Sequence, residues 1–124
     1  MPATILIVDD SATMRALVRE ALEADSHAVV EAIHGKAALT ALAETPVALV
    51  LTDVLMPEMD GLALVQAIRA DARLRALPVL ILSTEATPAV KERGRAAGAT
   101  GWLVKPFHPD TLRQTVRRVL AERA

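Results

Sequence analysis

Short apolar runs alternate with longer segments of helical spacing along the whole chain. Residues 5–8 are consecutive aliphatics, and comparable runs occur within 47–52 and 79–82. Unbroken runs of this length are typical of strands that are buried on both faces of a parallel sheet. Two weaker runs are consistent with strands at the edges of the same sheet. We therefore predict strands over residues 4–8, 28–32, 47–52, 79–82 and 101–104.

Helical patterns fill the intervals between these strands. After the first strand, apolar residues recur every three or four positions, which places them on one face of a helix. They are Met14, Leu17, Val18, Ala21 and Leu22. Similar patterns follow Gly35, Gly61 and Pro109. The segment 87–98 has few large apolar residues and carries Gly94 in its middle, so we expect this fourth helix to be the most loosely packed.

The alternation of strands and helices predicts an α/β fold. We predict a doubly wound five-stranded parallel sheet in the order 2-1-3-4-5, with helices on both faces. This order places the unbroken strands in the middle and the weaker ones at the edges. The length of 124 residues suits one domain over residues 1–124, with no repeat or linker inside it. Ligands of such sheets bind beyond the carboxyl ends of the strands, where the strand order reverses.

Composition narrows the function classes. Charged residues make up 23% of the chain and the net charge is -1, which argues against a nucleic-acid partner. The absence of cysteine excludes disulfides, thiolate metal sites and cysteine nucleophiles. The N-terminus lacks the features of a signal peptide and no apolar run has transmembrane length, so we expect a cytoplasmic protein without membrane contact. His27, His34 and His108 lack ligand spacing, and we expect solvated or capping roles for them.

Carboxylates follow two of the central strands. Asp9 and Asp10 come after the first strand, and Asp53 comes after the third. These ends are neighbours in the predicted order, and carboxylates that meet there repel one another unless a cation offsets their charge. Oxygen ligands with room for water suit Mg²⁺. Each aspartate taken alone is better explained as a helix cap or a solvated strand end, but their coincidence at this point favours a Mg²⁺ site.

Hydroxyl and ammonium groups follow the fourth and fifth strands. Ser83 and Thr84 follow the fourth strand, and Lys105 follows the fifth. A hydroxyl and an ammonium that face carboxylates and a metal form a site for a dianion, and phosphoryl transfer needs little beyond such positioning and charge neutralisation. A carboxylate can itself be the nucleophile and form an acyl phosphate.

Four motifs, VDDS, TDVLMPEMDG, LST and GWLVKPF, occur in this order at the predicted strand ends. The set resembles the receiver domain of bacterial response regulators, in particular the stand-alone chemotaxis proteins of the CheY type, which have a flavodoxin-like fold. The resemblance implies that Asp53 is the phosphoacceptor. It also implies that Asp10, Asp53 and the backbone carbonyl of Leu55 bind Mg²⁺ directly, and that Asp9 acts mostly through water. Leu55 replaces the asparagine of the chemotaxis protein, at a position linked to phosphoryl lifetime.

The same resemblance implies roles around the phosphoryl group. Ser83 and Lys105 would bind its oxygens, and with Thr84 and Trp102 they would form the switch. The bond between Lys105 and Pro106 would be cis. Ser83 stands where threonine is commoner in the family, and Trp102 stands where tyrosine, phenylalanine or histidine is usual.

The resemblance thus implies a phosphorylation-activated protein of two-component signalling. It would accept a phosphoryl group from a sensor histidine kinase or a histidine phosphotransfer protein. As a monomer it would then bind a protein target, with the flagellar motor switch as one candidate, through its fourth helix, fifth strand and fifth helix. A chemotaxis regulator and a phosphorelay intermediate or phosphate sink share this site, so both remain open. A metal-dependent aspartyl phosphatase is disfavoured, because such enzymes of the haloacid dehalogenase type carry a DxD pattern that VDDSAT lacks.

Overall fold

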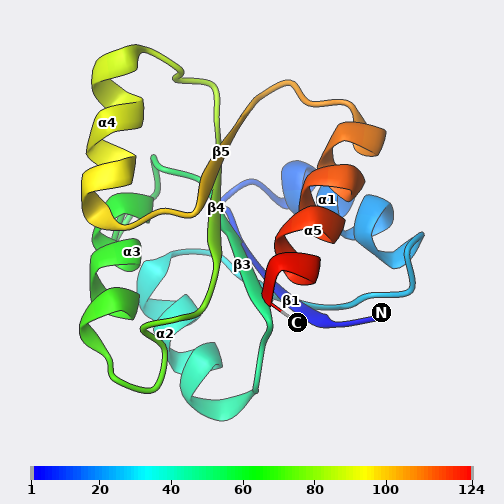
Figure 1. Cartoon of the computed structure of the whole chain (residues 1–124), viewed down its shortest axis with the longest axis horizontal. Coiled ribbons are helices and arrows are strands. Elements are labelled where there is room, and N and C mark those ends of the chain that lie inside the picture. Colours follow the sequence, from blue (N-terminus) through cyan, green and yellow to red (C-terminus); the bar gives the residue numbers. More distant parts are fainter. Residues whose placement is uncertain (1, 124) are drawn as a thin grey trace.

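The computed structural model describes residues 2–123, so the two ends of the predicted domain, residues 1 and 124, lie outside the described residues. Within this range, strands and helices alternate as predicted (Figure 1). The strands are β1 (Thr4–Val8), β2 (Ala28–Ala32), β3 (Leu49–Thr52), β4 (Val79–Ser83) and β5 (Gly101–Val104). The helices are α1 (Ala12–Glu23), α2 (Gly35–Glu44), α3 (Gly61–Ala70), α4 (Pro88–Ala97) and α5 (Pro109–Arg123).

The strands form one parallel sheet in the order β2-β1-β3-β4-β5, as predicted. Helices α1 and α5 cover one face of this sheet, and α2, α3 and α4 cover the other (Figure 1). Every residue of β3 and β4 is buried, whereas the edge strands β2 and β5 are mostly half-buried or exposed. The unbroken aliphatic runs are therefore the central strands, because only those are covered on both sides.

Two strand boundaries differ from the prediction. Strand β3 begins two residues later, because its paired register with β1 begins at Leu49. Strand β4 is one residue longer, because Ser83 still pairs with Val104 of β5. This extension places the Ser83 hydroxyl at the very edge of the sheet.

Helix α4 is held to the sheet by a small contact, as the sequence predicted. Gly94 is its one buried residue among those described. A Cβ atom on Gly94 would lie 2.6 Å from Cζ3 of Trp102, so the indole of β5 packs directly on the backbone of α4. Trp102 therefore faces the fourth helix, as strand alternation predicts.

The histidines divide between capping and burial. His34 caps α2, since its Nδ1 accepts the Ala37 N–H at 3.1 Å. The expected solvated or capping role is wrong for His27, whose exposed fraction is 6%. Its Nδ1 accepts the Ala3 N–H at 3.0 Å, because the turn after α1 folds the imidazole under the start of β1.

None of the helices in residues 2–123 combines the length and apolar character needed to cross a bilayer.

Candidate functional site

The backbone hydrogen bonds of the sheet continue into the residues of the site. The Asp53 N–H donates to the Val8 carbonyl at 3.0 Å, and the Lys105 N–H donates to the Ser83 carbonyl at 2.8 Å. The Asp9 N–H donates in the same way to the last carbonyl of β2 at 3.1 Å. Residues that follow three different strands are thus anchored to the rigid centre of the molecule.

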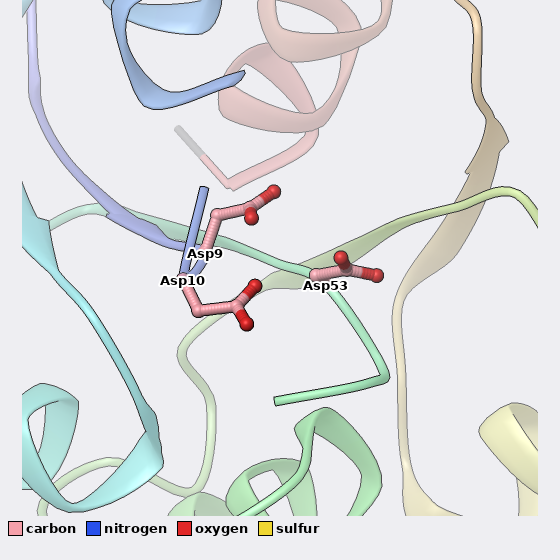
Figure 2. A group of neighbouring side chains, drawn as sticks. All are labelled: Asp9, Asp10 and Asp53. Atoms are coloured by element: carbon pink, nitrogen blue, oxygen red, sulfur yellow. The ribbon is translucent and has the colours of Figure 1, made fainter. Parts of the chain in front are cut away.

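Three carboxylates converge at the carboxyl edge of β1 and β3 (Figure 2). Asp9, Asp10 and Asp53 each present an oxygen, and these oxygens all lie within 4.8 Å of one another. Asp9 is buried, Asp53 is half-buried and Asp10 is exposed, so the cluster opens to solvent on one side. Carboxylate oxygens beside space for water are the donor set that suits Mg²⁺. The residues therefore fit a hard divalent cation.

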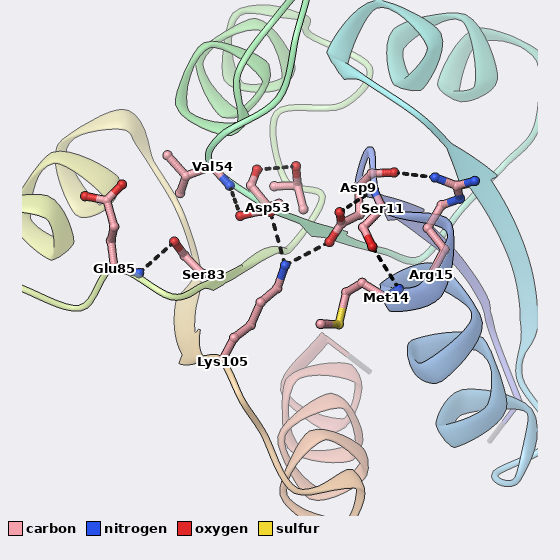
Figure 3. A network of polar contacts seen from close by, with 10 residues as sticks. Asp9, Ser11, Met14, Arg15, Asp53, Val54, Ser83, Glu85 and Lys105 are labelled. Atoms are coloured by element: carbon pink, nitrogen blue, oxygen red, sulfur yellow. Dashed lines mark hydrogen bonds and ion pairs between the residues drawn. The ribbon is translucent and has the colours of Figure 1, made fainter.

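Lys105 joins two of these carboxylates (Figure 3). Its Nζ donates to Asp9 Oδ2 at 2.9 Å and to Asp53 Oδ2 at 3.1 Å, and its side chain is 8% exposed. Burial by itself would lower the pKa of Lys105, but the hydrogen bonds to Asp9 and Asp53 outweigh burial and raise this pKa above its ordinary value. The side chain is therefore an ammonium at neutral pH. The Lys105–Pro106 bond after it is cis.

Asp53 is held from several sides. Its Oδ1 accepts the Val54 N–H at 2.7 Å, and its carbonyl accepts the Thr52 hydroxyl at 2.9 Å. Gly61, the first residue of α3, packs against the same carbonyl, because a Cβ atom there would lie 2.0 Å from the Asp53 oxygen. Only glycine allows this approach. The conformation of Asp53 is thus set before any ligand binds.

The other predicted residues lie around this cluster at different depths. Ser83 is buried and its Oγ accepts the Glu85 N–H at 3.1 Å. Thr84 is exposed in the loop after β4, and Leu55 is 64% exposed in the loop after β3. Trp102 lies apart on the α4 side of β5, where its Nε1 donates to the Glu85 carbonyl at 3.0 Å. The structure therefore links Ser83 and Trp102 through one loop residue.

Two contributors to the site were not predicted. Arg15 of α1 donates from Nη1 to the Asp9 carbonyl at 2.7 Å, and Gly61 makes room for Asp53. Arg15 carried no signal because it lies between the apolar positions of its helix and its acceptor is a backbone carbonyl, which no side-chain pattern marks. Gly61 ends the motif TDVLMPEMDG, which signals its presence but not its contact.

Comparisons with known proteins agree with this geometry. Residues 5–117 match the family described as response regulator receiver domain. The chain is 39% identical over 120 residues to chemotaxis protein CheY1 of Helicobacter pylori, covering 94% of this chain and 95% of that protein. It is 37% identical over 118 residues to the chemotaxis protein CheY homolog of Campylobacter jejuni, covering 94% and 91%.

The similarity extends to solved structures. The chemotaxis response regulator CheY4 of Vibrio cholerae aligns with a TM-score of 0.91 at 40% sequence identity, over 96% of this chain and 99% of that chain. The signal receiver domain of a signal transduction histidine kinase from Syntrophus aciditrophicus aligns with a TM-score of 0.91 at 33% identity, over 97% and 91% of the two chains.

Proposed function

Because the chain belongs to the family of response regulator receiver domains and is of the CheY chemotaxis type within two-component signalling, we propose that Asp53 is its phosphoacceptor. One observation carries this assignment. The Lys105 ammonium contacts Asp53 at 3.1 Å, at the point where the other two carboxylates also converge. Within residues 2–123, this is the one group of three carboxylates close enough together to share a metal ion.

In the proposed reaction an Asp53 oxygen attacks the phosphorus of a phosphohistidine on a sensor histidine kinase or a histidine phosphotransfer protein. A P–O bond forms as the P–N bond breaks, and the electron pair of that bond leaves with the imidazole. The positive charge of Lys105 and the hydroxyl of Ser83 stabilise the phosphoryl oxygens in the transition state and in the product. Water later hydrolyses the acyl phosphate, so we propose that the chemistry is confined to the protein's own Asp53 and that no separate substrate is turned over.

The acidic cluster would hold Mg²⁺. Three carboxylates and one ammonium leave a formal charge of -2 at the opening, which attracts a divalent cation. The side chains of Asp10 and Asp53 and the backbone carbonyl of Leu55 would be the direct ligands, and Asp9 would act mostly through water. When bound, the cation neutralises charge on the phosphoryl oxygens.

The output would be a change in target binding on the face of α4, β5 and α5. Ser83, Glu85 and Trp102 are joined by two hydrogen bonds, of 3.1 Å and 3.0 Å, which run from the phosphoryl site to this face. A Ser83 hydroxyl that turns toward a phosphoryl group would change the first bond and shift the loop. The partner would be a protein such as the flagellar motor switch, bound in the cytoplasm by the monomer. A phosphorelay intermediate or phosphate sink would use the same chemistry without this output.

Phosphorylation by acetyl phosphate and Mg²⁺ tests the assignment. We expect one modified residue, Asp53, in peptides mapped by mass spectrometry, and no acyl phosphate in Asp53→Asn. Asp60→Asn is the matched control, because Asp60 is an exposed aspartate that caps α3 and should not affect labelling. A label on another residue, or a label retained in Asp53→Asn, would refute the proposal.

A further inference from the structure

Two arginines of α1 share one carboxylate of β2. Arg15 Nε donates to Glu31 Oε1 at 2.8 Å, and Arg19 Nε donates to Glu31 Oε2 at 2.8 Å. Burial by itself would raise the pKa of Glu31, but the hydrogen bonds from Arg19 and Arg15 outweigh burial and lower this pKa. Glu31 is thus an ionised anchor for both guanidinium groups.

Only one of these arginines reaches the acidic cluster. Arg15 also donates from Nη1 to the Asp9 carbonyl at 2.7 Å, and its side chain is 16% exposed (Figure 3). Arg19 directs its remaining donors to Glu23 and to the Val29 carbonyl, away from the site, and is 37% exposed. The planar guanidinium of Arg15 presents Nε to the carboxylate and Nη1 to the carbonyl at the same time.

The Asp9 carbonyl belongs to the turn that carries Asp10. The Asp9 N–H is bonded to β2 at 3.1 Å, and Asp9 Oδ1 accepts the Ser11 N–H at 2.9 Å. Ser11 in turn caps α1. The side chain of Asp10 makes no hydrogen bond within the described part of the chain, so the backbone of this turn sets the direction of its Cα–Cβ bond and the region that its carboxylate can reach. The contact from Arg15 restrains that backbone at the peptide before Asp10.

We propose that Arg15, anchored by Glu31, is a positioning residue that holds the Asp9–Ser11 turn and thereby places the Asp10 carboxylate for Mg²⁺. This inference rests on the proposed function, since it concerns the same cluster. It predicts that removal of Arg15 changes the Mg²⁺ affinity in the direction opposite to that expected from charge alone. A positive charge near three carboxylates weakens cation binding, so its removal should tighten binding if charge alone matters. If position matters, removal of Arg15 should weaken binding.

Calorimetric titration with Mg²⁺ distinguishes these cases in the full chain. We expect the Mg²⁺ dissociation constant of Arg15→Met to rise by about tenfold, which is typical for the loss of a group that orients a metal ligand. Arg19→Met is the matched control, because it removes the same charge and the same Glu31 contact from the same helix but nothing from Asp9. Its dissociation constant should stay within about twofold of the native value. Urea unfolding should show similar losses of stability in both variants.

The remaining outcomes decide against the inference. Native or tighter Mg²⁺ binding by Arg15→Met shows that the contact does not position the site, and equal weakening in both variants shows that only Glu31 or the fold is involved. If Arg15→Met does not fold, Arg15→Gln decides in the same way, because it also removes the charge and its shorter side chain cannot span from Glu31 to the Asp9 carbonyl. Failure of the native protein to bind Mg²⁺ would instead refute the proposed metal site itself.

Discussion

Single side chains set the charge balance on which the site depends. Lys105 neutralises part of the charge of Asp9 and Asp53 through its 2.9 and 3.1 Å contacts, and its burial makes this pairing stronger than one at the surface. Removing one partner of a buried ion pair leaves the other charge uncompensated. Substitutions at this scale should therefore change stability and chemistry together.

Replacement of Lys105 by methionine should slow the labelling of Asp53 by acetyl phosphate on the order of 100-fold, because the ammonium that we propose to stabilise the phosphoryl oxygens is lost. The fold should persist in circular dichroism, with a lower free energy of unfolding since Asp9 loses its ammonium partner. Lys91→Met on the exposed side of α4 is the control and should label normally. An undiminished labelling rate in Lys105→Met would remove this side chain from the mechanism.

His27 should make stability depend on pH. Burial is the main cause that lowers its pKa below the ordinary 6.5, so the native state favours neutral imidazole. The unfolded chain binds the proton more readily, and the free energy of unfolding should therefore fall as pH drops below 6.5. A proton on Nδ1 would also break the bond from the Ala3 N–H. The buried Nε2 has no hydrogen-bond partner that would offset this loss.

Urea unfolding at about pH 5 and about pH 7.5 measures this dependence. His27→Asn should reduce the difference in stability between the two pH values, because its amide oxygen can accept the Ala3 N–H but does not titrate. His108→Asn is the control, since the His108 side chain is 71% exposed. An equal difference in native protein and His27→Asn would show that other groups cause the acid sensitivity.

At the scale of elements, α4 and β5 are joined by an unusual pairing of glycine and tryptophan. Glycine in the interior of a helix costs roughly 1 kcal/mol relative to alanine. The structure explains why it is kept here, because the indole of Trp102 occupies the space that a Cβ atom of Gly94 would need. The loose helix and the large aromatic are thus two parts of one contact.

The sign of the effect of Gly94→Ala should depend on Trp102. In the native background the added methyl lies 2.6 Å from Cζ3, and overpacking of about 1–3 kcal/mol should cancel or exceed the gain in helix propensity. In a Trp102→Val background the space is free, and Gly94→Ala should stabilise by roughly 1 kcal/mol. Urea unfolding of the four proteins gives the coupling. Equal stabilisation in both backgrounds would show that the two residues do not compete for space.

At the scale of the whole molecule, the site at Asp53 and the face formed by α4 and β5 are separate regions joined by the loop after β4. Ser83 and Trp102 contact the same residue, Glu85, through its N–H and its carbonyl. A change at the carboxyl edge of the sheet can therefore reach the indole without rearrangement of the core. Helix α4 has little buried side-chain surface to resist it.

Beryllofluoride, which mimics a phosphoryl group, should shift the emission of Trp102 and change its quenching by iodide. The shift should be absent in Asp53→Asn, because the ligand has no carboxylate to bind. Trp102 is the single tryptophan, so the signal reports on this face alone. Identical emission and quenching with the acceptor occupied, as shown by calorimetry, would mean that Trp102 is a fixed cover for β5 and that any signal passes through α4 without it.

The architecture and the location of the site followed from the sequence alone. Unbroken aliphatic runs mark strands covered on both faces, and this property ordered the sheet and brought Asp9, Asp10 and Asp53 to one edge. These inferences succeed because strands and helices have regular backbone repeats. The spacing of apolar residues follows these repeats, so it indicates which segments are strands and which of them are buried. The ends of the strands then locate the side chains to within a few residues.

Only the tertiary structure decided which side chains touch. The bridge from Lys105 to two carboxylates and the bond from the Ala3 N–H to buried His27 join residues far apart in the chain. The bond from Arg15 to the Asp9 carbonyl spans six residues but joins a helix to a strand end. Each of these contacts depends on a side-chain rotamer and on the distance of a helix or loop from the sheet. The spacing of apolar residues in the sequence carries no information about either quantity. The same holds for Gly94. The sequence shows that this glycine lowers helix propensity in α4, but only the folded structure shows that the indole of Trp102 packs against its backbone and leaves no room for a side chain.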